Sequence, residues 1–216
     1  MEKKKLLAST GSFSRAVLGG VLLAVTSVTL TACSSSDPVL YTLQPVTSAV
    51  PTVSSFSGQT APTLVEIRRP TIPETLDRDR VVLSDSGYKL DVAKTDAWSA
   101  PLSDQIPHVL ANDLRHRLPG TSFFVQDDAT SADPQAFVEL VVTRFSRDTS
   151  GNAVMDAQVS VHRADSDALK TNRSIHLSMP AAAGTEGLVS ALSTLIGQAA
   201  DQIAGDIRTL PPAPKQ

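Results

Sequence analysis

A single cysteine, Cys33, closes the apolar stretch near the amino terminus and limits how the rest of the chain can be held together. The stretch runs from Ala16 to Leu30 behind the basic residues 3–5. A basic flank, a short apolar core and small residues before a cut site are typical of a secretory signal peptide, and a membrane-spanning helix would need about 20 apolar residues. We therefore expect residues 1–32 to be cleaved off between Ala32 and Cys33. No second cysteine exists, so a disulfide within the chain is excluded.

The residues before the cut site give Cys33 a chemical use. Leu30-Thr31-Ala32-Cys33 resembles the lipobox of bacterial lipoproteins, in which the cysteine sulfur receives a diacylglycerol and the new amine is acylated. Several acyl chains anchor stably, since each buried CH₂ contributes roughly 0.8 kcal/mol. An Asp after the cysteine tends to retain such lipoproteins on the inner membrane, so Ser34 predicts the periplasmic face of the outer membrane. The alternative is an ordinary secretion signal with a chance cysteine near its end.

The charge of the mature chain argues against nucleic acid as a partner. Removing residues 1–32 takes away four of the 19 basic residues and one of the 22 acidic ones, which leaves 15 against 21 and a net charge of −6. Such a balance offers no electrostatic footprint for nucleic acid or anionic headgroups. The acyl groups on Cys33, and no basic patch, are expected to make the membrane contact.

The mature chain divides into three parts. Residues 33–62 hold the lipidated end, a short strand over 39–43 and a Ser/Thr/Pro-rich linker or surface loop from 44 onward. Residues 63–208 carry the periodic patterns and form one domain. Residues 209–216 are a Pro-rich tail.

The residue pattern in the first half of this domain predicts three strands and a helix. Strands are expected over 63–67, 80–83 and 88–92, the last two joined as a hairpin by a turn at 85–87. Trp98 is expected to be a core anchor rather than a ligand platform. Apolar residues at helical spacing predict a helix over 102–118, which either begins at Pro107 or is kinked there.

The second half predicts a sheet and a closing helix. After a strand over 122–126, strands over 137–145, 153–162 and 173–179 form an antiparallel meander with one solvated face, the first of them central because both of its faces are largely apolar. Thr185 can cap a final helix, in which Gly197 and Gly205 would allow close approach to the sheet. The order of elements predicts an α+β fold, a single domain with an antiparallel sheet and two helices packed on one side.

The sequence contains none of the catalytic motifs that we considered. The motifs of serine hydrolases, zinc peptidases and phosphate-binding loops are absent, and the one thiol is used by the anchor. His108, His116, His162 and His176 are expected on solvated faces, and His162 and His176 are candidate neighbours on adjacent strands. Asp127, Asp128 and Asp133 lack the loop of a calcium site. We predict no catalytic residue, no metal and no cofactor beyond the acyl chains on Cys33.

The densest charge cluster is Asp77-Arg78-Asp79-Arg80. Alternating charge in an extended segment usually marks a solvated edge that resists unwanted strand pairing. A docking role for Arg78 or Arg80 is the alternative.

Three short motifs behind the lipobox form a recognisable series. Tyr41-x-Leu43, then Pro73-x-x-Leu76-Asp77-Arg78 leading into Arg80-Val81-Val82, then Trp98-x-x-Pro101-Leu102 resemble the ABC-type transport auxiliary lipoprotein family, with its PqiC-like outer-membrane lipoproteins. The resemblance covers most of the mature chain. It implies a non-enzymatic accessory subunit of a lipid transport system that contains a mammalian-cell-entry (MCE) domain protein, and only Cys33 carries over as a functional residue.

These inferences meet in one expected function, a docking or adaptor subunit that holds an MCE-type transport assembly against outer-membrane lipid. The alternative from another class is a periplasmic carrier that holds a lipid between sheet and helices, and an enzyme is the least favoured class. Because a ring-shaped partner can be matched in symmetry only by a homo-oligomer, a homo-oligomer is possible.

Overall fold

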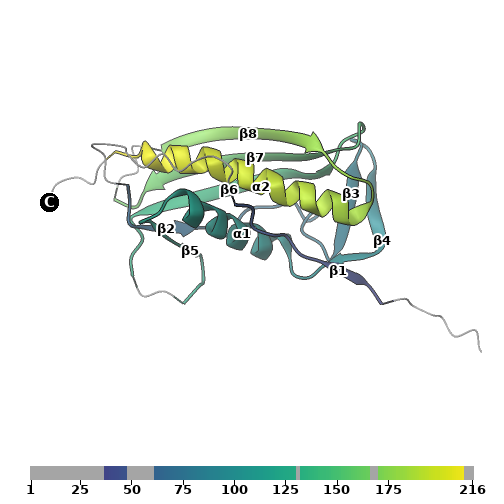
Figure 1. Ribbon diagram of the computed structural model, residues 1–216, viewed down its shortest axis with the longest axis horizontal. Helices are drawn as coiled ribbons and strands as arrows, with labels where there is room; N and C mark the ends of the chain where they lie inside the picture. Colours follow the sequence, from purple (N-terminus) through teal and green to yellow (C-terminus); the bar gives the residue numbers. More distant parts are fainter. Residues whose placement is uncertain (1–36, 48–60, 130–131, 166–169, 212–216) are drawn as a thin grey trace, which may run out of the picture. The chain divides into compact units, whose positions relative to one another are not determined.

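The structure is a computed structural model that describes residues 37–47, 61–129, 132–165 and 170–211. Within these ranges it contains eight strands and two helices (Figure 1). Their bounds are β1 Val39–Tyr41, β2 Leu64–Ile67, β3 Arg80–Asp85, β4 Leu90–Trp98, α1 Leu102–Arg117, β5 Ser122–Val125, β6 Ala136–Arg147, β7 Asn152–Arg163, β8 Lys170–Pro180 and α2 Gly184–Arg208. No helix in the described part of the chain is both long and apolar enough to cross a membrane.

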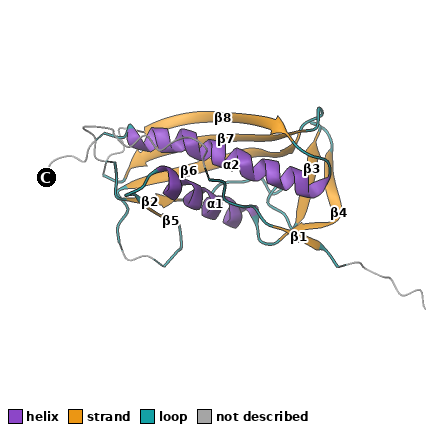
Figure 2. Cartoon of the chain, in the orientation of Figure 1, coloured by secondary structure: helices purple, strands orange, loops and turns teal. Residues whose placement is uncertain are grey.

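All eight strands belong to one sheet, and the two helices cover one of its faces (Figure 2). Helix α2 lies across β6, β7 and β8, and α1 packs beside α2. The expected α+β fold with both helices on one side is confirmed.

The sheet is mixed, and the expectation of an antiparallel sheet was incomplete. The meander β6–β7–β8 and the hairpin β3–β4 are antiparallel as predicted. Four further pairings are parallel, namely β1 with β4, β2 with β5, β2 with β6 and β3 with β6. A parallel pair needs a long crossover connection, and the segment from β2 to β5, which contains α1, supplies one. The pattern within one strand does not reveal such a distant partner.

The long strand β6 organises the sheet. One of its edges pairs with β7 over nearly its whole length. The other edge pairs with β2 at residues 136–138 and with β3 only at Arg147. Strict alternation would place Phe145 on the same outer face as Phe137, because the two residues are an even number of positions apart. A bulge between Val142 and Arg144 shifts the alternation, and Phe145 is therefore buried in the core. The central position predicted for this strand is confirmed.

The core lies between the sheet and the helices. The α2 stripe of Leu188, Leu192, Leu195, Ile203 and Ile207 is fully buried, as its spacing predicts. It faces the buried phase of β7, which comprises Ala153, Met155, Ala157, Val159 and Val161. Because alternate residues of a strand point to opposite faces, the apolar phase of β7 meets this stripe while Gln158 stays exposed.

Several element boundaries differ from the sequence prediction. Strand β4 begins at Leu90 and ends at Trp98, so Tyr88 lies in the turn and is fully exposed. The turn is tight because Gly87 has φ +84° and its N–H donates to Asp85 Oδ1. Helix α1 begins at Leu102, which places Pro107 inside the helix rather than at its start.

The predicted capping of α2 by Thr185 is wrong. The helix begins at Gly184, two residues earlier than a cap at Thr185 implies, and its cap residue Ala183 makes no side-chain hydrogen bond. The Thr185 hydroxyl donates instead to Asp96 Oδ2 on β4, which ties the amino end of α2 to the sheet. The side chain at the predicted cap position therefore binds a residue of β4 rather than the backbone of its own helix.

Candidate functional site

The three motifs that are far apart in sequence converge at the amino end of α1. Tyr41 pairs with Trp98 across the β1–β4 ladder, and the Ser99 N–H donates to the Tyr41 carbonyl at 2.8 Å. The Trp98 N–H donates to the Asp79 carbonyl at 2.7 Å. Trp98 is 6% exposed, which confirms it as a core residue, and Leu76 and Leu102 are buried in the same core. The motifs thus describe one packed junction.

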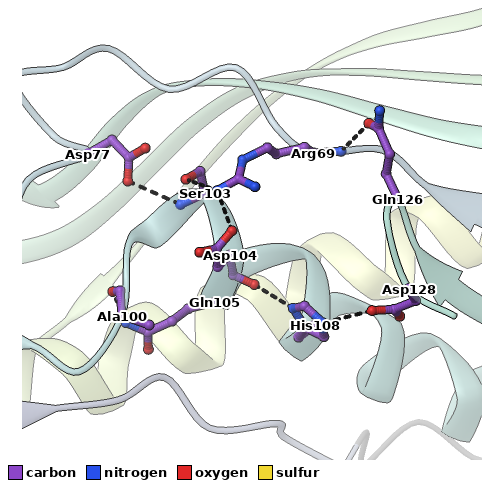
Figure 3. Close-up of polar contacts among 9 residues, drawn as sticks. All are labelled: Arg69, Asp77, Ala100, Ser103, Asp104, Gln105, His108, Gln126 and Asp128. Carbon is purple, nitrogen blue, oxygen red and sulfur yellow. Dashed lines mark hydrogen bonds and ion pairs between the residues drawn. The ribbon is translucent and has the colours of Figure 1, made fainter.

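Asp77 closes this junction by capping α1. Its Oδ1 accepts a hydrogen bond from the Ser103 N–H at 3.2 Å (Figure 3), one of the four N–H groups that an α-helix leaves unpaired at its start. A carboxylate at this end is also favoured by the helix dipole. The charge cluster is therefore not uniformly a solvated edge, because Asp77 is half-buried and structural while Arg78 and Asp79 are exposed.

Arg69 adds a second connection to the same helix end. Its guanidinium forms an ion pair with Asp104 and donates to Ser103 Oγ at 3.2 Å (Figure 3). Its backbone N–H donates to Gln126 Oε1 at 3.1 Å. The segment after β2, the start of α1 and the end of β5 are thereby joined at one place.

The chain that leads from β1 lies along the two helices. We call residues 42–46 the amino-terminal strap. The Leu43 N–H donates to Gln105 Oε1 of α1 at 2.9 Å, and the Gln44 N–H donates to Ser193 Oγ of α2 at 3.1 Å. The expected linker from residue 44 therefore begins as an ordered segment bound to both helices, and residues 48–60 lie outside the described residues.

Arg117 and Asp113 hold the end of the strap. The Val46 N–H donates to Asp113 Oδ1 at 2.7 Å, and Arg117 Nη1 donates to the Val46 carbonyl at 3.3 Å. Arg117 also donates to the Gly197 carbonyl at 2.8 Å and to Asp201 Oδ1 at 2.6 Å. A charged side chain as buried as Arg117, at 6% exposure, needs such partners to offset its lost hydration.

Gly197 lets the strap approach α2. A Cβ at this position would lie 3.3 Å from the Val46 Cβ and 3.5 Å from Arg117 Nη2. The expected close approach is therefore to the strap and to Arg117 rather than to the sheet. A Cβ on Gly205 would have no neighbouring atom within 4 Å, so the expected close approach does not occur at that residue.

Asp113 is the most perturbed carboxyl group of the described chain. Burial raises its pKa from 3.8 to about 6, and the negative charge of Asp201 acts in the same direction. The Val46 hydrogen bond and the positive charges of Arg117 and His116 oppose this rise. Its Oδ2 has no hydrogen-bond partner within the protein. The strap is therefore held by a carboxylate whose charge is costly to bury.

A surface groove of about 420 Å³ runs between the strap and α1. Leu43 and Val109 contribute an apolar floor, and the rim is polar, with Asp104, His108 and Asn112 from α1. The His108 ring contacts the Asp104 carbonyl at 2.7 Å and Asp128 Oδ1 at 3.4 Å (Figure 3). The combination of an apolar floor and a polar rim suits a binding surface.

The residues predicted to carry lipidation and sorting, Ala32, Cys33 and Ser34, lie outside the described residues, and their roles stay predictions. Within the described ranges, no group of three or more His, Cys, Asp or Glu side chains is arranged to hold a metal ion.

The histidines divide into exposed and buried ones. His108, His116 and His176 are exposed as expected, but His162 is buried at 7% exposure, which corrects its predicted solvated position. Its ring lies 5.3 Å from that of Phe137 and 3.6 Å from Glu139 Oε1. His162 pairs with Lys170 and His176 pairs with Asp156, so the two imidazoles are not neighbours.

The side chains that bind the strap were missed by sequence reasoning. Gln105, Asp113, Arg117 and Ser193 are polar residues within helices, and such residues are normally solvated. The spacing of Asp113 and Arg117, one helical turn apart, was the available signal, since it places them on one face. Nothing in the sequence indicates that this face would be covered by residues 42–46.

Comparison with known proteins places these features in a family. The model of the family described as "ABC-type transport auxiliary lipoprotein component" matches residues 41–204, which include the strap, the motif junction and most of α2. A search of curated proteins found no match.

Solved structures show the same fold at low sequence identity. An uncharacterised protein is 20% identical with a TM-score of 0.63, and the alignment covers 79% of this chain and 99% of the other. A Xanthomonas campestris protein assigned to DUF330 is 15% identical with a TM-score of 0.62, covering 78% and 94% respectively. These likenesses concern the fold.

Proposed function

This chain belongs to the family of ABC-type transport auxiliary lipoprotein components, and we propose that it is the outer-membrane-anchored docking subunit of an MCE-type lipid transport system. In this proposal Cys33 carries the acyl chains, the domain lies on the periplasmic face, and a periplasmic MCE-domain protein is the partner. The proposed role is adaptor rather than enzyme.

The observation that carries the proposal is the attachment of the strap. The strap begins nine residues after Cys33 and is hydrogen-bonded to Gln105, Ser193 and Asp113. A load applied by a partner to the domain would therefore pass through the strap and β1 toward the anchor. A loose tether would stretch before it carried such a load, because flexible linkers behave as random coils.

The packing of β6 favours the adaptor over the lipid carrier. The lipid-carrier alternative rests on apolar residues of β6, and these residues are divided between the two faces of the strand. Val138, Leu140 and Val142 close on the core beneath the helices. Phe137 and Val141 lie on the face that the helices leave uncovered, where Val141 is 40% exposed. The strand therefore has surplus apolar surface on its outside, where a protein partner can reach it.

The groove beside α1 is the proposed contact surface for the partner. Its apolar floor and polar rim have the composition of a small protein-binding surface. A photo-crosslinking residue at the exposed position Asn112, in the full-length chain in cells, should yield a covalent product that contains an MCE-domain protein. The same residue at Ser174, beside Val141 on the uncovered sheet face, tests the second candidate surface. Tyr88, fully exposed in the turn between β3 and β4, is the matched control position.

Absence of an MCE-domain protein from crosslinks at both positions, with the chain shown to be membrane-bound, would count against the partner. Lipid extraction and mass spectrometry of the purified domain test the carrier function, which a bound lipid at one per chain would support. Sedimentation of the protein tests whether it forms the homo-oligomer that a ring-shaped partner would match.

A further inference from the structure

Strand β1 exposes two large apolar side chains at its start. Val39 is 52% exposed and Leu40 is 62% exposed. Because consecutive residues in a strand point to opposite faces, these side chains flank the end of the strand on both sides. We propose that this end of β1 lies in the headgroup region of the lipid bilayer and fixes the orientation of the domain on the membrane.

The position of β1 on the body is fixed from both sides. It forms a parallel ladder with β4, in which Val39 is opposite Asp96 and Tyr41 is opposite Trp98. Directly after it, the strap is bound to α1 and α2. Strand β1 therefore moves only with the whole domain.

The length of chain before β1 places the bilayer beside it. This step rests on the lipidation of Cys33 in the proposed function. Five residues lie between Cys33 and Val39, and the six Cα–Cα steps of a fully extended chain span at most about 20 Å. Strand β6 alone has 12 residues and extends about 40 Å. The anchor therefore reaches the bilayer only if the β1 end of the domain faces it.

The charges around β1 select the kind of lipid surface. Asp37 precedes the strand, and the pKa of Tyr41 is raised by burial and by the negative charges of Asp96 and Glu186. Negative charge at this end disfavours a surface rich in anionic headgroups. The surface that fits is a zwitterionic bilayer into which the two apolar side chains insert.

The test uses the lipidated full chain, purified and reconstituted into phosphatidylcholine vesicles that carry a nitroxide on the upper acyl chain. In Leu40→Cys the new thiol is the one open to labelling, because the Cys33 sulfur is already bonded to lipid. The nitroxide should lower the fluorescence of a bimane label at position 40 about twofold, as expected for a group at the boundary between headgroups and acyl chains. A label at Val39→Cys should do the same, and one at Ser174→Cys should be unaffected.

The possible outcomes separate the two proposals. If the protein floats with the vesicles and the labels at 39 and 40 are quenched no more than the label at 174, the membrane contact of β1 is refuted while the anchor stands. If the lipidated protein does not float with vesicles, the anchor fails and this inference fails with it. Unchanged melting temperatures show that the labelled variants are folded.

Discussion

The Val46 N–H donates a 2.7 Å hydrogen bond to Asp113 Oδ1, across 67 positions of sequence. This contact joins Val46, the last residue of the strap, to a fully buried carboxyl group on α1. It also leaves Asp113 Oδ2 without a partner in a region where burial has raised the pKa of the group.

The first prediction concerns the pH dependence of stability. The folded protein holds the Asp113 proton up to about pH 6, whereas the unfolded chain releases it near 3.8. The folded state thus binds more protons between these values, so the contribution of Asp113 is present below pH 3.8 and is lost as the pH rises through about 6. In Asp113→Asn this loss disappears, so the unfolding free energy of the variant relative to wild type should rise between pH 4 and 7.

Chemical denaturation across that pH range makes the measurement. The matched control is Asp79→Asn, because Asp79 is exposed. A difference between Asp113→Asn and wild type that stays constant from pH 4 to 7 would show that Asp113 titrates as an ordinary carboxyl group.

The second prediction tests the cap of α1. In Asp77→Ala the Ser103 N–H loses its acceptor, which should lower the unfolding free energy by about 1 kcal/mol. Asp79→Ala removes a nearby carboxylate that is exposed and should change stability by less than about 0.5 kcal/mol. Urea titration at pH 7 gives both values, and equal effects would contradict the capping role.

The third prediction compares two glycines within α2. A Cβ on Gly187 would lie 2.4 Å from the Ala182 carbonyl oxygen, whereas one on Gly205 meets nothing within 4 Å. Gly187→Ala should therefore lower the melting temperature, at a cost of about 1–3 kcal/mol. Gly205→Ala should raise it, through a gain of about 0.5–1 kcal/mol from better helix propensity. Calorimetry decides, and a stabilised Gly187→Ala protein would mean that residue 182 moves aside freely.

The fourth prediction concerns the anchor. Cys33→Ser removes the sulfur that would accept diacylglycerol, so the precursor should be neither lipidated nor cleaved and should leave the outer-membrane fraction. Its melting temperature should match that of wild type, because the described core is built without Cys33. Ser34→Asp should keep lipidation and shift the protein toward the inner membrane. Full cofractionation of Cys33→Ser with outer membrane would instead require a protein contact to explain the location.

The sequence by itself determined the elements that depend on short-range periodicity. Alternation along residues 153–162 and 173–179 specified two strands of the meander and their buried phases, because a strand with one wet face must alternate. Helical spacing identified the α2 stripe for the same kind of reason. The lipobox and the family motifs are also local patterns, so they indicate the family without any knowledge of the fold.

Only the tertiary structure decided which distant segments meet. The parallel pairs of β2 and the change of face at Phe145 depend on partners that are far away in the chain. The same holds for the strap, since Gln105, Asp113, Arg117 and Ser193 are polar helix residues that look solvated until residues 42–46 cover them. A hydrogen bond between remote groups leaves no periodic pattern in either segment. For this reason only the tertiary structure reveals that the strap is attached to the helices.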